Sequence, residues 1–182
     1  MVCMGNICRS PMAERLLARE VGDLVYVHSA GTGGWHVGST MDPGAARQVR
    51  SRGGDCDRFA ARKLDGGLID GSDLILTATI EQVEYIADLR PDAAGRTFVF
   101  GEFGRLLRSA DLSSLPPAAA DQDTVHARAV ALVEAVDKVR AGTRPTVADE
   151  LDDPYGRGES YFSRVADEIE DVVLPLAAAL LP

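Results

Sequence analysis

Cys3 and Arg9 stand near the start of the chain with five residues between them, among them Gly5 and Asn6, and Ser10-Pro11 follows directly. A short loop of this kind can turn successive backbone N–H groups inward, and Ser10-Pro11 can open a helix whose first N–H groups attract an anion. The planar guanidinium of Arg9 can hold two phosphate oxygens at once. The positive field favours the thiolate of Cys3, which is a nucleophile. The stretch therefore predicts nucleophilic attack on a phosphate group.

Residues 3–11 resemble the signature of the low-molecular-weight protein tyrosine phosphatases, C-x-G-N-I-C-R-S-P, at every fixed position. The resemblance implies hydrolysis of protein phosphotyrosine through a phosphocysteine on Cys3, without a metal or other cofactor. Ser10 would donate a hydrogen bond to the Cys3 sulfur and help it leave in the second step. The phosphate would be bound by Arg9 and by the rest of the loop, which is Met4, Gly5, Asn6, Ile7, Cys8 and Ser10.

A second candidate site residue is Asp153, in the segment Asp152-Asp153-Pro154-Tyr155. Asp-Pro alone is only a turn signal. Beside a thiolate, however, one carboxyl can protonate the leaving group and then take a proton from the hydrolytic water. The family's D-P-[YF] loop implies that Asp153 has this role, with Asp152 as the neighbour most easily mistaken for it. The resemblance also implies that Tyr155 and Trp35 form the aromatic rim around the substrate ring.

The chain departs from the family at two positions that normally brace the phosphate loop. Phe59 replaces a histidine, and Thr79 replaces an aspartate. In the resemblance both bracing residues act through the loop asparagine, which is Asn6 here. We therefore expect Asn6 to find other partners, such as Ser10 and Ser29.

Three other activities are compatible with parts of this pattern. Arsenate reductases share the loop but need further cysteines downstream, and Cys56 alone cannot supply a pair. Protein arginine phosphatases of the same fold tend to carry threonine at the position of Ile7, so Ile7 favours phosphotyrosine. Thr79 and Gly156, which also leaves the rim more open, are features shared with arginine phosphatases, so this alternative stays open.

A non-catalytic phosphotyrosine-binding module is the third alternative. Such a module would be expected to lose Cys3 or Asp153, and both are present. The opposing observation is that only Met1 and Val2 precede Cys3, so the first strand is largely missing. A shortened central strand could leave the chain poorly active, and we expect that the sequence begins inside a longer natural chain.

Composition limits the partners. A net charge of −9 argues against nucleic acid or an anionic membrane as the main partner. The three cysteines include no C-x-x-C pair, which fits a cytoplasmic protein without a zinc site. In the family, a cysteine placed as Cys8 can form a reversible disulfide with the nucleophile. The apolar run 172–181 is about half of the ~20 residues that a membrane span needs. We expect a monomer that acts on tyrosine-phosphorylated proteins.

Helical and strand patterns alternate along the chain, which indicates an α/β protein with a parallel sheet. Strands are predicted over 24–30, 73–78 and 96–100. Helices are predicted over 11–20, 44–52, 81–89, 101–108, 125–140 and 159–173. Ser10 is expected to cap the first, Asp42 the second, and Pro175 is expected to kink or end the last. The resemblance implies three layers, α/β/α, around about four strands. Residues 1–182 would form one phosphatase-like domain with an extended 101–145 segment.

Overall fold

A parallel four-stranded sheet in the order β2-β1-β3-β4 lies at the centre of the computed structural model, which describes residues 1–182. The strands are β1 (Val2–Cys3), β2 (Ala30–Gly31), β3 (Ile75–Thr77) and β4 (Thr97–Val99). Val2 pairs with Ala30 on one side and with Thr77 on the other, so β1 is an interior strand. Cys3 is therefore at the carboxyl edge of the sheet, where ligands bind in open α/β sheets.

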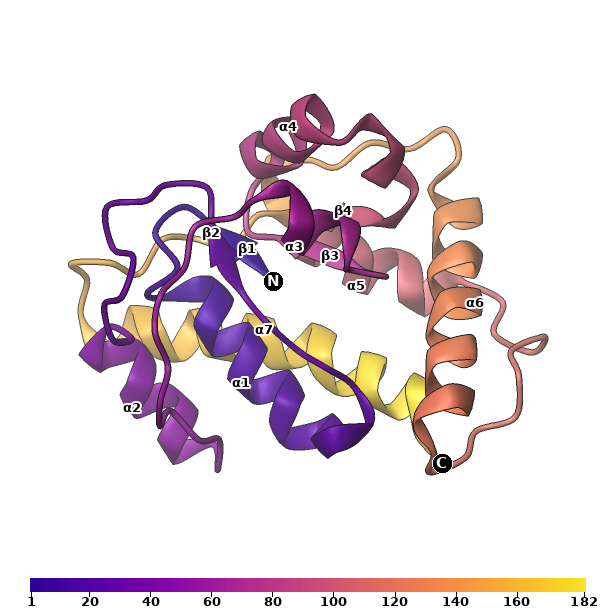
Figure 1. Ribbon diagram of the computed structural model, residues 1–182, viewed down its shortest axis with the longest axis horizontal. Helices are drawn as coiled ribbons and strands as arrows, with labels where there is room; N and C mark the ends of the chain where they lie inside the picture. Colours follow the sequence, from indigo (N-terminus) through magenta and orange to yellow (C-terminus); the bar gives the residue numbers. More distant parts are fainter.

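Helices cover both faces of the sheet (Figure 1), which confirms the predicted three layers. One face packs against the larger apolar core, to which α1 (Arg9–Val21), α2 (Pro43–Ser51), α5 (Phe100–Ser109), α6 (Gln122–Arg140) and α7 (Glu159–Leu180) contribute. The other face carries a smaller cluster with α3 (Gly66–Asp70) and α4 (Ile80–Leu89). Short 3-10 turns lie at Gly22–Leu24, Pro91–Arg96 and Val147–Asp149.

The start of α1 differs from the prediction. The helix begins at Arg9, and its N-cap is Cys8 rather than Ser10. Ser10 is buried inside the first turn, and its hydroxyl is directed to the Cys3 sulfur instead of a helix N–H. At α2 the predicted cap is confirmed, because Asp42 Oδ1 accepts a hydrogen bond from Gly44 N at 2.7 Å.

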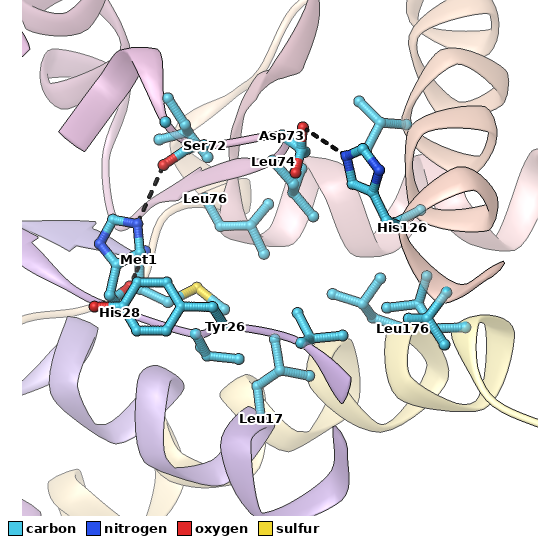
Figure 2. A pocket seen from close by; sticks show the side chains of 18 of the residues that line it. Met1, Leu17, Tyr26, His28, Ser72, Asp73, Leu74, Leu76, His126 and Leu176 are labelled. Carbon is cyan, nitrogen blue, oxygen red and sulfur yellow. Dashed lines mark hydrogen bonds and ion pairs between the residues drawn. The ribbon is translucent and has the colours of Figure 1, made fainter. Parts of the chain in front are cut away.

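The predicted strand over 24–30 is wrong for most of its length, since only Ala30 and Gly31 are in β2. The pairing of β2 with β1 starts at Val2 and Ala30, and residues 24–27 lie in no strand. An apolar groove of about 440 Å³ opens there instead, between residues 24–28 and 72–76 (Figure 2). The Met1 amine lies in this groove and donates to His28 O at 2.8 Å, and Tyr26 is 81% exposed.

Pro175 lies inside α7 and does not end it, while a kink there stays a prediction. The proline lacks an N–H and so removes one helical hydrogen bond. Buried apolar residues before and after it, including Val173 and Leu176, keep the helix packed on the core. Tertiary packing therefore outweighs the local preference.

No helix of the chain combines the length and the hydrophobicity that crossing a bilayer requires.

Candidate active site

The Cys3 sulfur is buried at the end of β1 and has two hydrogen-bonding neighbours. Ser10 Oγ lies 3.0 Å from Cys3 Sγ, and the Asn6 backbone N–H donates to the same sulfur at 3.3 Å. Both contacts come from the loop and first helical turn that follow the strand. The Asn6 N–H donates to the sulfur, whereas in the contact with Ser10 either Oγ or Sγ can be the donor.

The loop between β1 and α1 has backbone N–H groups without a hydrogen-bond acceptor. Those of Met4, Gly5, Ile7 and Cys8 donate to no acceptor in the protein. They lie between the nucleophile and the N-terminus of α1, whose dipole is positive. The loop therefore offers a cradle of the kind that binds phosphate in other proteins.

Asn6 holds the loop in shape from the inside. Its backbone is left-handed, with φ of 54°, a conformation in which asparagine is among the few tolerated side chains. Asn6 Nδ2 donates to Ser10 Oγ at 2.9 Å and to Ser29 Oγ at 2.8 Å, the two partners expected from the sequence. Arg62 N donates to Asn6 Oδ1 at 2.8 Å, a contact that the sequence did not indicate.

Two further residues complete the support for this loop. Ser29 Oγ donates to the buried carboxylate of Glu14 at 2.5 Å, which links the loop to α1. Gly31 lies so near the loop that a Cβ on it would meet Met4 O at 2.6 Å, so only glycine fits there. Phe59, at the position of the family's bracing histidine, is buried in the core under Arg15.

Arg9 and Asp153 are brought together although 143 residues lie between them in the sequence. Arg9 Nη2 is 2.7 Å from Asp153 Oδ2, and Arg9 Nη1 donates to Leu151 O at 3.2 Å. The Leu151 N–H in turn donates to Ala78 O at 2.9 Å, just after β3. The sheet edge therefore fixes the distant segment beside the phosphate loop.

The two adjacent aspartates are directed to different partners. The carboxylate of Asp152 is 2.6 Å from Arg164 Nη2, on α7. Asp153 instead faces Arg9, and about half of its side chain is exposed. The geometry thus favours Asp153 over Asp152 as the carboxyl that a bound substrate would meet.

Cys8, the expected redox partner, is buried at the start of α1. Burial, followed by the charges of Asp42 and Asp153, raises the pKa of the Cys8 thiol far above its ordinary value. Cys8 is therefore a thiol at neutral pH and no competing nucleophile. Cys3, Cys8 and Cys56 are all free, and a disulfide between Cys3 and Cys8 stays a prediction.

Three aromatic side chains lie near the loop. Trp35 and Tyr155 are 66% and 60% exposed, and the rim that they are expected to form stays a prediction. His36 lies between them, with its ring centroid 6.3 Å from that of Trp35 and 6.3 Å from that of Tyr155. The sequence reasoning did not select His36 as a site residue. Its position directly after Trp35 is the signal that could have found it.

A second cavity adjoins the site. It measures about 410 Å³ and begins at Met4, directly after the nucleophile. Its walls include Thr32, Trp35 and Tyr85, and three carboxylates of α4: Glu81, Glu84 and Asp88. Space for a larger substrate is therefore present beside the phosphate loop.

The family model of low molecular weight phosphotyrosine protein phosphatases matches residues 1–142. This chain belongs to that family. Low molecular weight protein-tyrosine phosphatase A of Mycobacterium tuberculosis is 53% identical over 66 residues, which are 34% of this chain and 40% of that protein. Low molecular weight protein-tyrosine-phosphatase Ptp of Acinetobacter johnsonii is 40% identical over 56% of this chain and 70% of its own length.

Solved structures of this phosphatase family share the fold. The tyrosine phosphatase Wzb from Escherichia coli K30, in complex with sulphate, superposes with a TM-score of 0.67 at 26% identity, over 97% of this chain and 93% of that one. The YwlE arginine phosphatase from Geobacillus stearothermophilus has a TM-score of 0.68 at 24% identity, over 97% and 88%. The second likeness establishes the fold alone.

Proposed function

We propose that this phosphatase-family chain removes phosphate from phosphotyrosine in proteins, with Cys3 as the nucleophile. The supporting observation is the convergence of Cys3 Sγ, the free N–H groups of the loop and the Arg9–Asp153 pair at one edge of the sheet. Each of these groups has a task in transferring a phosphoryl group, and no other part of the chain gathers them.

In the first step the phosphate binds in the loop, with its oxygens on the free N–H groups and on the Arg9 guanidinium. Arg9 then exchanges its contact with Asp153 for the phosphate, which frees the carboxyl to face the leaving oxygen. The released Asp153 carboxylate takes up a proton from solvent. The Cys3 thiolate then attacks phosphorus, the bond to the tyrosine oxygen breaks, and Asp153 gives its proton to that oxygen.

The second step returns the enzyme to its starting state. The Asp153 carboxylate takes a proton from water, and the water oxygen attacks phosphorus. The sulfur–phosphorus bond breaks, inorganic phosphate forms, and the Cys3 thiolate is restored with Ser10 Oγ beside it at 3.0 Å.

The proposal is tested on three peptides of the same sequence that carry phosphotyrosine, phosphoserine or phosphoarginine. We expect the highest kcat/KM for phosphotyrosine, and no change when a chelator is added. A higher kcat/KM for phosphoarginine would select the alternative activity that Gly156 and Thr79 leave open. Binding of all three without turnover would identify a non-catalytic module instead.

A further inference from the structure

The segment that leads to Asp153 is attached to the sheet edge by its backbone. The Leu151 N–H donates to Ala78 O at 2.9 Å, and Arg9 Nη1 donates to Leu151 O at 3.2 Å. Leu151 is buried, and two residues later the Asp153 carboxylate lies 2.7 Å from Arg9 Nη2. The place of this segment therefore determines where the Asp153 carboxyl lies relative to the phosphate loop.

Glu150 attaches the same segment to α4 (Figure 1). Its Oε1 atom accepts a hydrogen bond from Ile80 N at 2.8 Å. Ile80 is the first residue of α4, and the N–H groups at this end of a helix have no partner within the helix. A carboxylate bound there is stabilised both by the charge-assisted hydrogen bond and by the positive end of the helix dipole.

Two hydrogen bonds thus join residues 78–80 to residues 150–151. The bond from Leu151 N to Ala78 O fixes one point of the segment, about which the chain that follows could still pivot. The bond from Ile80 N to Glu150 Oε1 fixes a second point and therefore the direction of the segment. Asp153 is three residues after Glu150, and about half of its side chain is exposed, so packing alone does not hold it.

We propose that Glu150 is a positioning residue, which acts through Asp153 by holding the 150–153 segment at the N-terminus of α4. This inference rests on the proposed function, in which Asp153 is first the acid and then the base. When Arg9 exchanges Asp153 for phosphate, the ion pair that holds the carboxyl is lost. The Glu150 contact is then what keeps the carboxyl near the leaving oxygen.

The test compares Glu150→Ala and Glu150→Gln with the wild-type protein. In Glu150→Ala we expect kcat for a phosphotyrosine peptide to fall about tenfold, because the acid is no longer held in place. The Kd for inorganic phosphate should stay within about twofold, since Leu151 keeps its own bond to Ala78 O. Glutamine retains an oxygen that can accept from Ile80 N, so kcat of Glu150→Gln should stay within about threefold of wild type. Glu134→Ala, at an exposed position of α6, is the matched control and changes neither quantity.

A double-mutant cycle shows whether Glu150 acts through Asp153. In the Asp153→Ala background, adding Glu150→Ala should lower kcat by less than about twofold, because the carboxyl that Glu150 positions is already gone. The same tenfold loss in that background would mean that Glu150 only supports the fold, and would overturn the inference. An unchanged kcat in the single variant Glu150→Ala would overturn it as well.

Hydrogen exchange of the Ile80 amide tests the contact without reference to activity. This amide should exchange at least about tenfold faster in Glu150→Ala than in the wild-type protein. Equal exchange rates would show that the contact is absent in solution and would overturn the inference. If the wild-type protein turns over phosphotyrosine and Glu150→Ala is as active, this inference alone fails. If the wild-type protein does not turn over phosphotyrosine, the proposed function itself fails.

Discussion

A substitution at Cys3 can separate phosphate binding from catalysis. The groups expected to bind phosphate are Arg9 and the loop N–H groups, whereas the group expected to attack phosphorus is the Cys3 sulfur. Cys3→Ser keeps Arg9 and the free N–H groups of the loop. We expect turnover of a phosphotyrosine peptide to fall by at least about 10⁴-fold, while inorganic phosphate binds within a few-fold of wild type. Calorimetry and steady-state kinetics on the same preparation measure the two effects. Turnover near the wild-type rate would refute covalent catalysis.

Alanine substitutions at Asp153 and Asp152 distinguish which of the two carboxyls acts as the acid. Asp153→Ala should lower kcat for a phosphotyrosine peptide by about 10²- to 10⁴-fold, because a phenolate is a poor leaving group without a proton. The loss should be much smaller in the first step with p-nitrophenyl phosphate, whose leaving group needs no acid. Asp152→Ala is the matched control, since Asp152 pairs with Arg164 away from the site. A larger loss in Asp152→Ala than in Asp153→Ala would assign the role of the acid to Asp152.

Among the elements, the connection between β2 and α1 is the one on which the phosphate loop depends most. Ser29 precedes β2, is fully buried, accepts from Asn6 and donates to Glu14 of α1. Ser29→Ala leaves a buried amide hydrogen and a buried carboxylate without this partner. We expect the free energy of unfolding to fall by about 1–3 kcal/mol.

The Ser29→Ala variant should also lose affinity for inorganic phosphate, since Asn6 shapes the loop. Denaturant unfolding and phosphate titration measure the two losses. Ser114→Ala, at an exposed serine without a hydrogen bond, should change stability by less than about 0.5 kcal/mol. Phosphate affinity unchanged in Ser29→Ala would show that Asn6 needs no support from this side.

The helices were largely predictable because their signals are local. The Asp42 cap and the helices predicted over 81–89 and 125–140 correspond to α2, α4 and α6. The strand expected over 24–30 could not be predicted locally, because a strand forms only where another strand pairs with it, and β1 has only two residues. Likewise, the burial that carries α7 through Pro175 arises from packing that no local pattern contains.

The sequence names candidate site residues but not their geometry. The signature over residues 3–11 indicates Cys3 and Arg9, the D-P-[YF] loop indicates Asp153, and their roles stay predictions. It is the fold that brings Arg9 and Asp153 to 2.7 Å. Long-range contacts such as Arg62 N to Asn6 Oδ1 have no signature, because a backbone donor can come from any residue type.

For the molecule as a whole, the burial of His28 predicts how stability depends on pH. Burial lowers the pKa of His28 from 6.5 to about 4. As the pH falls from 6.5 to 4, the unfolded chain takes up a proton at His28 that the folded chain resists. The free energy of unfolding should therefore fall over this range by about 1–2 kcal/mol, a figure reduced because the ring is partly exposed to solvent.

Urea unfolding at a series of pH values between about 4 and 6.5 measures this dependence. His28→Gln should reduce it, because the neutral form of His28 is favoured in the folded protein and glutamine takes up no proton in this range. The same pH dependence in His28→Gln as in the wild-type protein would show that His28 is not buried in solution.

The most direct test of the central claim is to trap phosphate on Cys3. In Asp153→Ala, p-nitrophenyl phosphate needs no acid to leave, whereas hydrolysis of the phosphocysteine lacks its base, so the intermediate should accumulate. After rapid quenching with radiolabelled substrate, we expect about one label per chain, on the peptide that contains Cys3, and none in the Cys3→Ser, Asp153→Ala double variant. A label on any other residue, or one that persists without Cys3, would contradict the mechanism.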